Sequence, residues 1–371
     1  MVKKQTVGIL FGGKSAEHEV SLQSAKNVYE AIDRSRYEPV LIGIDKSGRW
    51  LLNETASFLL NSDDPKHISL DLSGDPVALI PASTGALSIG SAPHSLPPAL
   101  QTPLKLDVIF PILHGPFGED GTVQGLLKLA DLPFVGPGVL GSAAGMDKDV
   151  MKRLLRDSGI PIGKFLAIRS SETAPAFAKV TETLGLPFFI KPANMGSSVG
   201  IAKVHNEDEY LPAMSDAFQY DNKILIEEFI SGRELECAVL GNETPEASVV
   251  GEVCSSHEFY SYNAKYLDEN GASLEIPANI TAETAGKARD LAIQTFRALC
   301  CEGLSRVDFF LRENGDVLVN EINTMPGFTK ISMYPKLWEA SGISYTGLIV
   351  RLIELAIERY AKEQKLKTSV V

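Results

Sequence analysis

The sequence lacks an uninterrupted apolar stretch of about 18 residues, so no segment is expected to span a membrane. It also lacks an excess of basic residues. Lys and Arg number 35 against 47 Asp and Glu, for a formal charge of −12, which argues against nucleic acid or an anionic membrane as a partner. The first residues, MVKKQTVGILFGG, lack a small-residue cleavage site, so we interpret them as a strand entering a glycine turn rather than a signal peptide.

Cysteine is scarce as well. The four cysteines, Cys237, Cys254, Cys300 and Cys301, show no C-x-x-C spacing, so no zinc site is expected. The adjacent pair cannot join distant segments. We therefore expect free thiols and a cytoplasmic protein. The chain has 371 residues, of which 44% are hydrophobic, so it is long enough for two or three domains with buried cores.

The first third of the sequence alternates short apolar runs with a helical pattern. The runs at 6–11, 39–44 and 107–112 are expected to form strands, with a helix between the first two. This alternation predicts a parallel α/β sheet. Residues 53–104 are rich in Ser, Pro, Asp and Gly, and we expect a long irregular excursion from this domain.

The pattern changes in the rest of the chain. A single helix is expected from about Ser142 to Ser158, with Gly159 as its C-terminal stop. Closely spaced strands with few helices between them should then pair antiparallel, at 188–191, 199–204, 224–230, 234–240 and 247–253. Helices at 281–300 and 345–360 flank two further strands.

The segment from Gly8 to Ser15 formally matches the phosphate-loop pattern G-x-x-x-x-G-K-S, so a phosphate-loop kinase is one alternative. That motif would require residues 9–11, Ile-Leu-Phe, to form an exposed turn, whereas these side chains need burial in a strand. We therefore reject it and expect the turn at residues 12–13. Glu17 then lies near a helix start at the carboxyl edge of the sheet, where it either binds a small ligand or suits the helix N-terminus.

The strongest chemical pattern lies in residues 305–323. Asn314-Gly315 predicts a two-residue hairpin turn, in which Glu313 pairs with Asp316. Because side chains alternate along a strand, this register decides which residues share a face.

The register predicts that Asp308 lies opposite Glu321 and Arg306 opposite Asn323, all on one face. Opposed carboxylates repel unless a cation lies near them. One possibility is a salt bridge to Arg306. The alternative that we favour is Mg²⁺ bound by Asp308, Glu321 and Asn323, with Arg306 free for an anion.

A glycine-rich segment, residues 191–200, lies between two strand patterns. Its small residues would let backbone N–H groups close over phosphates as a flap. Together with Lys191 and the magnesium face, it indicates a nucleoside triphosphate.

These segments are similar, in order and nearly from end to end, to the motifs of the D-alanine:D-alanine ligase family of the ATP-grasp superfamily. The blocks that carry the resemblance are FGGKSAEHEVSL, LHGPFGEDG, MDKDVMKRLL, FFIKPANMGSSVG, IEEFISGRELE, the AKY segment, SRVDFF and NEINTMPGFTKISMYPKL.

The resemblance implies a three-domain architecture of mixed α/β and α+β class. An N-terminal parallel α/β domain would span 1–140, a central ATP-grasp domain 141–226, and a C-terminal domain 227–371 with a lid loop at about 255–272. ATP would lie between the last two domains. The family implies ATP and two Mg²⁺ ions as cofactors, with Mn²⁺ as a substitute, and a homodimer formed through the N-terminal domain.

The implied reaction is ligation of two D-alanines to D-alanyl-D-alanine, through an acyl phosphate, for peptidoglycan precursor synthesis. The phosphorylated carboxyl group supplies the leaving group, and cations offset the charge of the anionic partners. Carried over by motif, the metal ligands are Asp308, Glu321 and Asn323. The implied nucleotide contacts are Lys148 and Lys191 for the phosphates, Glu227, Phe229 and Ile230 for the adenine, Glu234 for the ribose, and Ser198, Lys265 and Asn320 nearby.

The resemblance also implies the substrate contacts. Glu17 would hold the ammonium group of the first D-alanine, with His114 near the same subsite unless that histidine only caps a turn. Arg306 and the Gly327 N–H would bind the oxyanion. The remaining contacts are Ser332 and Met333 for the second carboxylate, Lys265 and Tyr266 on the lid, and Ser197, which would bond to Tyr266 and Glu17.

Two alternatives stay open within this superfamily. A depsipeptide ligase would use a hydroxy acid such as D-lactate as the second substrate, and it would depart from the Lys265-Tyr266 pair that this sequence keeps. A catalytically silent ATP-binding protein would lose a metal ligand or Arg306, and the sequence retains them.

Overall fold

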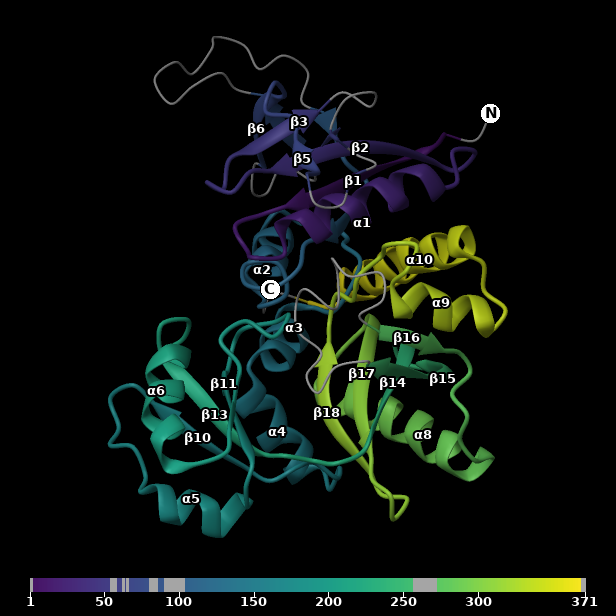
Figure 1. Ribbon diagram of the computed structural model, residues 1–371. Helices are drawn as coiled ribbons and strands as arrows, with labels where there is room; N and C mark the ends of the chain where they lie inside the picture. The colour runs from purple at the N-terminus through teal and green to yellow at the C-terminus, as the bar shows by residue number, and fades with distance from the viewer. Residues whose placement is uncertain are drawn as a thin grey trace.

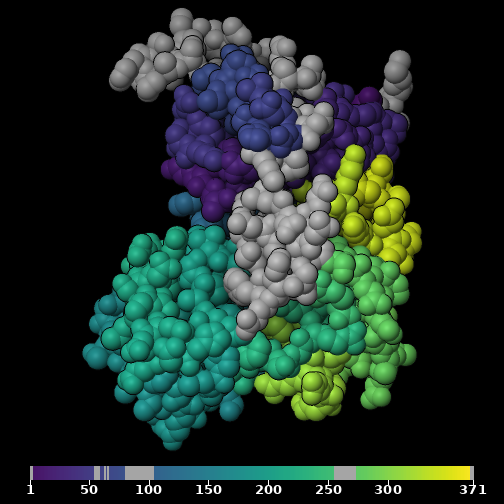
Figure 2. Space-filling model, viewed as in Figure 1, coloured from purple at the N-terminus to yellow at the C-terminus, as the bar shows by residue number. Residues whose placement is uncertain are grey.

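The protein is described here from a computed structural model that covers residues 3–53, 59–61, 64, 67–79, 86–89, 104–255 and 272–367 (Figure 1). Within these ranges the strands form sheets of seven, four and five strands and one two-stranded pair. The N-terminal part, coloured purple to blue, lies above two bodies that face each other, one teal and one green to yellow (Figure 2).

The N-terminal sheet has the strand order β8-β7-β6-β3-β2-β1-β9. Strand β1 pairs in parallel with both β2 and β9, as predicted, while the neighbours beyond β2 are antiparallel. The strands of this sheet are β1 (Gln5–Gly12), β2 (Tyr37–Ile44), β3 (Trp50–Asn53), β6 (Asp75–Leu79), β7 (Ala86–Ile89), β8 (Leu104–Lys105) and β9 (Val108–Ile112). Ile9, Leu10 and Phe11 are fully buried, which confirms the rejection of a phosphate loop.

The excursion at 53–104 is not simply irregular. Its described residues add short strands that extend the sheet, together with the pair β4 (Leu59–Leu60) and β5 (Ser69–Leu70). Strands of two to five residues give too short an apolar alternation to recognise, and Pro76 inside β6 argues against a strand in sequence analysis.

Helix α1 (His18–Ala31) covers one face of this sheet with Val20, Leu22, Ala25 and Val28. The last helix, α10 (Tyr345–Glu363), packs against α1 and β9, so the two ends of the chain share one hydrophobic core. This contact fixes the C-terminal sheet against the N-terminal one.

The helix predicted at 142–158 is divided in two. Its two parts are α3 (Val139–Met146) and α4 (Lys148–Asp157), and helix α2 (Thr122–Leu129) precedes them. The break lies at Asp147, because its carboxylate accepts hydrogen bonds from the N–H groups of Asp149 and Val150 and so caps a new helix.

The four-stranded sheet has the order β10-β13-β11-β12 and is antiparallel throughout, as predicted. Its elements are β10 (Phe165–Arg169), α5 (Phe177–Leu184), β11 (Phe188–Pro192), β12 (Ala202–Val204), α6 (Glu207–Ala217) and β13 (Lys223–Glu228). Helices α5 and α6 were not predicted from the sequence. For α6 the sequence did carry an indication, since Asn206 caps it and three acidic residues form its first turn.

The five-stranded sheet has the order β16-β15-β14-β17-β18, also antiparallel. Its elements are β14 (Arg233–Gly241), β15 (Glu246–Ser255), β16 (Ala272–Glu275), α8 (Ala282–Ala298), β17 (Gly303–Leu311), β18 (Val317–Asn323) and α9 (Met333–Ala340). On β14, Cys237 and Val239 pack in the core that holds α8, whereas Ala238 and Leu240 pack with α9. Because neighbouring residues of a strand face opposite ways, the two helices cover opposite faces.

Two expectations, free thiols and no membrane-spanning segment, can be compared with the described residues. All four cysteines are free, as expected. Among the described helices none is long and apolar enough by itself to cross a membrane, while α9 and α10 together reach that measure across a bend of 103°.

Candidate active site

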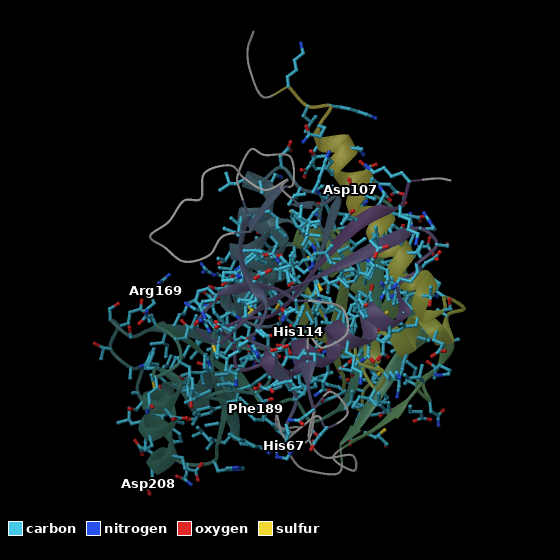
Figure 3. All side chains as sticks on the ribbon, turned by 90° about the horizontal axis from the view of Figure 1, so that it is seen from above. His67, Asp107, His114, Arg169, Phe189 and Asp208 are labelled. Carbon is cyan, nitrogen blue, oxygen red and sulfur yellow. The ribbon has the colours of Figure 1, made fainter. Side chains whose placement is uncertain are left out.

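A cavity of about 1470 Å³ lies between the parts of the chain that carry the three larger sheets. Its walls include strands of the four- and five-stranded sheets, helix α1, and the loops that follow β1 and β9. Figure 3 shows His114 near the middle of the molecule, whereas Arg169 and Asp208 lie at its outer edge. The described candidates brought together in this cavity are Glu17, His114, Lys148, Lys191, Ser197, Ser198, Glu227, Ile230, Glu234, Arg306, Asp308, Asn320, Glu321, Asn323, Gly327, Ser332 and Met333.

Three candidates are not in that set. The ring of Phe229 lies outside the cavity wall, with its centroid 6.1 Å from that of Phe189 and 4.2 Å from Lys203 Nζ. Lys265 and Tyr266, on the expected lid loop, lie outside the described residues.

The hairpin brings Asp308 opposite Glu321 and Arg306 opposite Asn323, as predicted. The predicted turn, however, is wrong. Arg312 pairs with Asp316 and Gly315 has a φ of 85°, so the loop contains three residues rather than two.

A second deviation restores the predicted pairs. The register shifts by one residue between Asp308 and Phe309, because Asn320 forms a bulge on β18 between Val319 and Glu321. The longer turn and the bulge offset each other, and the site residues end in the expected register. The bulge also places both Asn320 and Glu321 in the cavity wall.

The third strand of the site, β14, adds a carboxylate that the sequence analysis did not single out. Glu236 pairs with Asp308, which pairs with Glu321, so three carboxylates stand in a row across β14, β17 and β18. Three acids in a row would repel one another without nearby cations.

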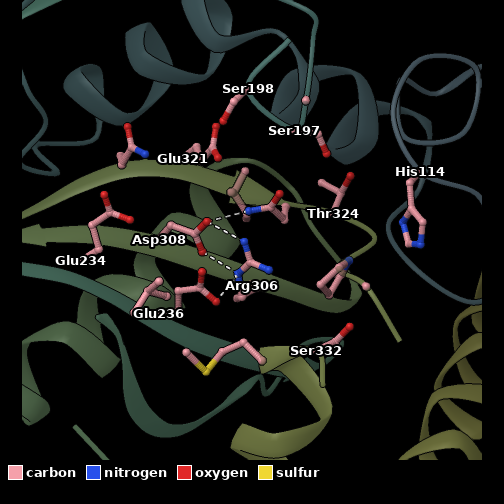
Figure 4. A pocket seen from close by; sticks show the side chains of 18 of the residues that line it. His114, Ser197, Ser198, Glu234, Glu236, Arg306, Asp308, Glu321, Thr324 and Ser332 are labelled. Atoms are coloured by element: carbon pink, nitrogen blue, oxygen red, sulfur yellow. Dashed lines mark hydrogen bonds and ion pairs between the residues drawn. The ribbon is translucent and has the colours of Figure 1, made fainter. Parts of the chain in front are cut away.

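Arg306 and Lys148 provide those cations. Arg306 Nε lies 2.7 Å from Asp308 Oδ1 and 2.8 Å from Glu236 Oε2, and its Nη2 lies 2.7 Å from Asp308 Oδ2 (Figure 4). Lys148 Nζ lies 3.6 Å from Glu321 Oε2. The expectation of an arginine left free for an anion is therefore wrong for this structure, since the planar guanidinium fits the carboxylate in a bidentate pair.

Lys191, one of the two lysines predicted to bind phosphate, belongs to a buried cluster around Glu227. Lys191 Nζ lies 2.6 Å from Glu227 Oε2, and Lys152 Nζ lies 3.3 Å from Glu227 Oε1. Lys152 was not predicted, although its place one turn after Lys148 on α4 puts both on one helix face. Burial lowers the pKa of Lys152, although the Glu227 carboxylate opposes that shift. Burial alone would raise the pKa of Glu227, but Lys152 and Lys191 outweigh this effect and hold the pKa of Glu227 below its usual value.

The glycine-rich flap forms a tight turn over the cavity. Val199 N donates to Gly196 O, and Ser197 and Ser198 both have a positive φ, of 51° and 61°. This is a type I′ turn, which usually contains Asn or Gly. The hydroxyl of Ser197 donates to Glu17 Oε1, as predicted from the family resemblance.

Glu17 points into the cavity rather than capping α1. It occupies the N-cap position of that helix but makes no capping hydrogen bond with its side chain. A Cβ atom at Gly115 would lie 2.6 Å from Glu17 Oε2, and one at Gly196 would lie 3.0 Å from it. Two glycines from different parts of the fold thus allow backbone to close around the carboxylate.

Glu119 lies in the LHGPFGEDG motif, although the sequence analysis did not predict it as a site residue. Its Oε2 accepts from Gly115 N at 2.7 Å, and its Oε1 accepts from Met325 N at 2.8 Å. Burial and then the Glu17 carboxylate raise the pKa of Glu119 to about 8, although both N–H groups and Arg306 oppose this shift. Its hydrogen bond to Met325 N could be found only from the three-dimensional arrangement.

The two ends of the cavity carry different side chains. Glu234 lies at one end of the labelled set, and His114 and Ser332 lie at the other (Figure 4). Ser332 precedes α9 and its hydroxyl accepts from Thr329 N at 3.0 Å. A Cβ atom at Gly327 would lie 2.9 Å from Ser332 Oγ, so glycine is needed for this close approach.

Comparison with known proteins agrees with the family resemblance seen in the sequence. Two family models match the chain, one described as D-ala D-ala ligase N-terminus over residues 6–137 and one as D-ala D-ala ligase C-terminus over residues 154–354. The chain is 55% identical over 368 residues to a protein of Shouchella clausii named D-alanine–D-alanine ligase, which covers 99% of this chain and 98% of that protein. It is 53% identical over 372 residues to the D-alanine–D-alanine ligase A of Escherichia coli strain K12, which covers 100% of both.

Solved structures are similar over nearly the whole chain. One is the D-alanine-D-alanine ligase from Coxiella burnetii, with a TM-score of 0.84 and 36% identity, covering 98% of this chain and 97% of that one. Another is the VanG D-Ala:D-Ser ligase from Enterococcus faecalis, with a TM-score of 0.83 and 35% identity, covering 95% of this chain and 100% of that one.

Proposed function

The chain belongs to the D-alanine–D-alanine ligase family, and on that premise we propose how its own residues carry out the reaction. It ligates two D-alanines to D-alanyl-D-alanine with ATP, for peptidoglycan synthesis, and it has the three-domain ATP-grasp fold. The observation that supports the assignment of roles is that Glu17, the lysine cluster and the carboxylate row line one cavity. We further propose domain boundaries at 1–140, 141–226 and 227–371.

The donor set of the hairpin fits magnesium. Asp308 and Glu321 offer carboxylate oxygens on one face, and Asn323 donates through Nδ2 to Asp308 Oδ2 at 2.9 Å, so its amide oxygen is the atom that a cation would take. Oxygen ligands of this kind suit Mg²⁺ rather than a softer metal. We propose that these residues hold two Mg²⁺ ions, with Mn²⁺ as a substitute. Bound there, the ions would offset the negative charge of the phosphates.

The nucleotide is proposed to lie between the flap and the hairpin. Lys148 and Lys191 would bind its phosphates, with Ser198 and Asn320 beside them. Glu234 would accept the ribose hydroxyls at the far end of the cavity. Ile230 would contact the adenine, and Phe229 would act through its backbone, since its ring lies outside the cavity wall.

The first D-alanine is proposed to lie between Glu17, which would hold its ammonium group, and Arg306, which would face its carboxylate. One oxygen of that carboxylate takes the γ-phosphoryl group, which gives an acyl phosphate and ADP. Asp308 and Glu236 keep the Arg306 guanidinium in place, so it is preorganised for the negative charge that develops on the remaining oxygen.

The second D-alanine is proposed to bind with its carboxylate at Ser332 and the Met333 N–H. Its amine attacks the acyl carbon, the oxyanion forms between Arg306 and the Gly327 N–H, and phosphate leaves. We propose that Lys265 and Tyr266 close over the acyl phosphate and exclude water. We also propose that the protein is cytoplasmic, because ATP is a cytoplasmic substrate, and that it forms a homodimer through the N-terminal domain, as the family resemblance implies.

The choice of second substrate is tested by product analysis. The purified protein with ATP and Mg²⁺ is given D-alanine alone, L-alanine alone, or D-alanine with D-lactate or D-serine. We expect D-alanyl-D-alanine as the main product, with both residues of D configuration. A main product containing D-lactate or D-serine would assign the chain to the depsipeptide ligases or to the type named in the Enterococcus faecalis relative, and no turnover would favour a silent ATP-binding protein.

A further inference from the structure

The backbone on both sides of Gly327 is held by side chains from distant parts of the chain. On the N-terminal side, Met325 N donates to Glu119 Oε1 at 2.8 Å, and Met325 O accepts from His114 Nδ1 at 2.9 Å. Both side chains belong to the loop that follows β9 in the N-terminal sheet. His114 and Glu119 therefore bind the backbone C=O and N–H of the same residue, Met325.

The other side of Gly327 is held in the same way. Phe328 N donates to Ser24 Oγ at 3.2 Å, and Phe328 O accepts from the Tyr345 hydroxyl at 2.6 Å. Ser24 lies on α1 and Tyr345 at the start of α10. Four side chains outside the segment thus hold the backbone groups of Met325 and Phe328, on either side of Pro326-Gly327.

Ser24 and His114 join the two sides into one chain of hydrogen bonds. A carbonyl oxygen only accepts, so the proton of His114 lies on Nδ1, and Nε2 of the neutral ring accepts from Ser24 Oγ at 3.3 Å. Burial lowers the pKa of His114 and so favours the neutral ring. Both ring nitrogens are therefore engaged by protein groups.

We propose that Ser24, His114 and Glu119 are positioning residues that hold the Met325–Phe328 backbone so that the Gly327 N–H faces the reacting carboxyl group. This inference rests on the proposed role of Gly327. It gives α1 and the loop after β9 a part in the chemical step, beyond binding the first substrate. Ser24 itself is fully buried and does not line the cavity, so it can act only through the segment that it holds.

Ser24 permits a clean test, because Ser24→Ala changes no charge. Loss of the hydroxyl removes the bonds to Phe328 N and His114 Nε2. It should lower kcat at least about three- to tenfold, while the KM for ATP should stay within about twofold. Ser24→Thr keeps the hydroxyl and should restore kcat. The matched control is Ser21→Ala, on the same helix and equally buried, whose hydroxyl accepts from Gly12 N and donates to Ile112 O but does not reach the Gly327 segment. Ser21→Ala should lose thermal stability as Ser24→Ala does, with kcat unchanged.

A second pair tests the other side of the segment. Glu119→Gln should lower kcat with little change in the KM for ATP, because an amide cannot accept from both Gly115 N and Met325 N. Asp120→Asn is its control, since Asp120 accepts from Phe117 N and Thr122 N on the same loop but not from Met325.

Different outcomes would overturn the positioning role and the proposed function. Equal kcat in Ser24→Ala and wild type, or an equal fall in Ser21→Ala, would overturn the positioning role while the wild type still ligates D-alanine. A wild type that forms no D-alanyl-D-alanine would overturn the proposed function and this inference with it.

Discussion

Ser197 donates a hydrogen bond from its hydroxyl to Glu17, although 180 positions separate the two residues. The bond joins the flap of the four-stranded sheet to the start of α1, so the proposed nucleotide site and the proposed first-substrate site share one contact. The flap therefore forms part of the pocket around Glu17. The contact occurs at a turn whose backbone is itself unfavourable for serine.

The positive φ of the flap turn predicts that glycine at position 198 makes the protein more stable than alanine does. Ser198 has a φ of 61°, a conformation that costs an ordinary L-residue roughly 1–2 kcal/mol, and glycine avoids this cost. We expect Ser198→Gly to be about 1 kcal/mol more stable than Ser198→Ala, which keeps the strain and loses the hydroxyl. Urea unfolding of the two variants measures the difference. Equal stability would mean that the turn opens without cost.

Glu119 predicts a pH dependence of stability. Burial, and then the Glu17 carboxylate, raise its pKa in the folded protein to about 8, from the usual value of 4.5. Between these values the native protein holds a proton that the unfolded chain has released, so the free energy of unfolding falls as pH rises through this window. Relative to Glu119→Gln, which does not titrate, the wild type should therefore lose stability from pH 5 to pH 8. A difference that stays constant over this range would contradict the raised pKa.

The cluster of Lys152, Glu227 and Lys191 predicts unequal costs of substitution. Glu227→Gln leaves two buried lysines without a carboxylate, which should cost about 3–5 kcal/mol. Lys152→Met leaves the Glu227–Lys191 pair intact and should cost less. Combined with Glu227→Gln, it should recover part of the lost stability, because one of the two unpaired charges is gone. Additive losses in the double variant, measured by urea unfolding, would show that the three charges are not coupled.

Glu321 predicts a separation of stability from metal use. Glu321→Gln removes one of three carboxylates in a row, so stability without metal should hold or rise. The same change removes a charged ligand, so the Mg²⁺ concentration for half-maximal activity should increase. Glu313→Gln, in the exposed turn of the same hairpin, is the control. Lower stability with unchanged Mg²⁺ dependence would instead assign Glu321 a structural pairing role with Lys148.

The hairpin shows how far the sequence could be interpreted. The pairs Asp308–Glu321 and Arg306–Asn323 were predicted correctly, but from a two-residue turn that the structure does not have. The bulge at Asn320 corrects the register, and nothing in a single sequence indicates it, because a bulge depends on how neighbouring strands pair.

The interpretation was weakest where contacts cross the whole chain. Glu236 enters the site because β14 pairs with β17, Glu119 because it reaches Met325, and Lys152 because it shares Glu227 with Lys191. Their partners lie far away in sequence, so periodicity and spacing cannot relate them. The break at Asp147 is different, since an N-cap residue was present in the sequence and an unbroken apolar pattern concealed it.

The central claim is that the cavity activates the carboxylate of the first D-alanine by phosphorylation. D-Alanine labelled with ¹⁸O in its carboxylate tests this directly, because the oxygen that accepts the phosphoryl group leaves with it when the amine attacks. The account predicts that one ¹⁸O atom appears in the inorganic phosphate for each dipeptide formed, as measured by mass spectrometry. Inorganic phosphate without ¹⁸O, alongside normal formation of the dipeptide, would contradict it.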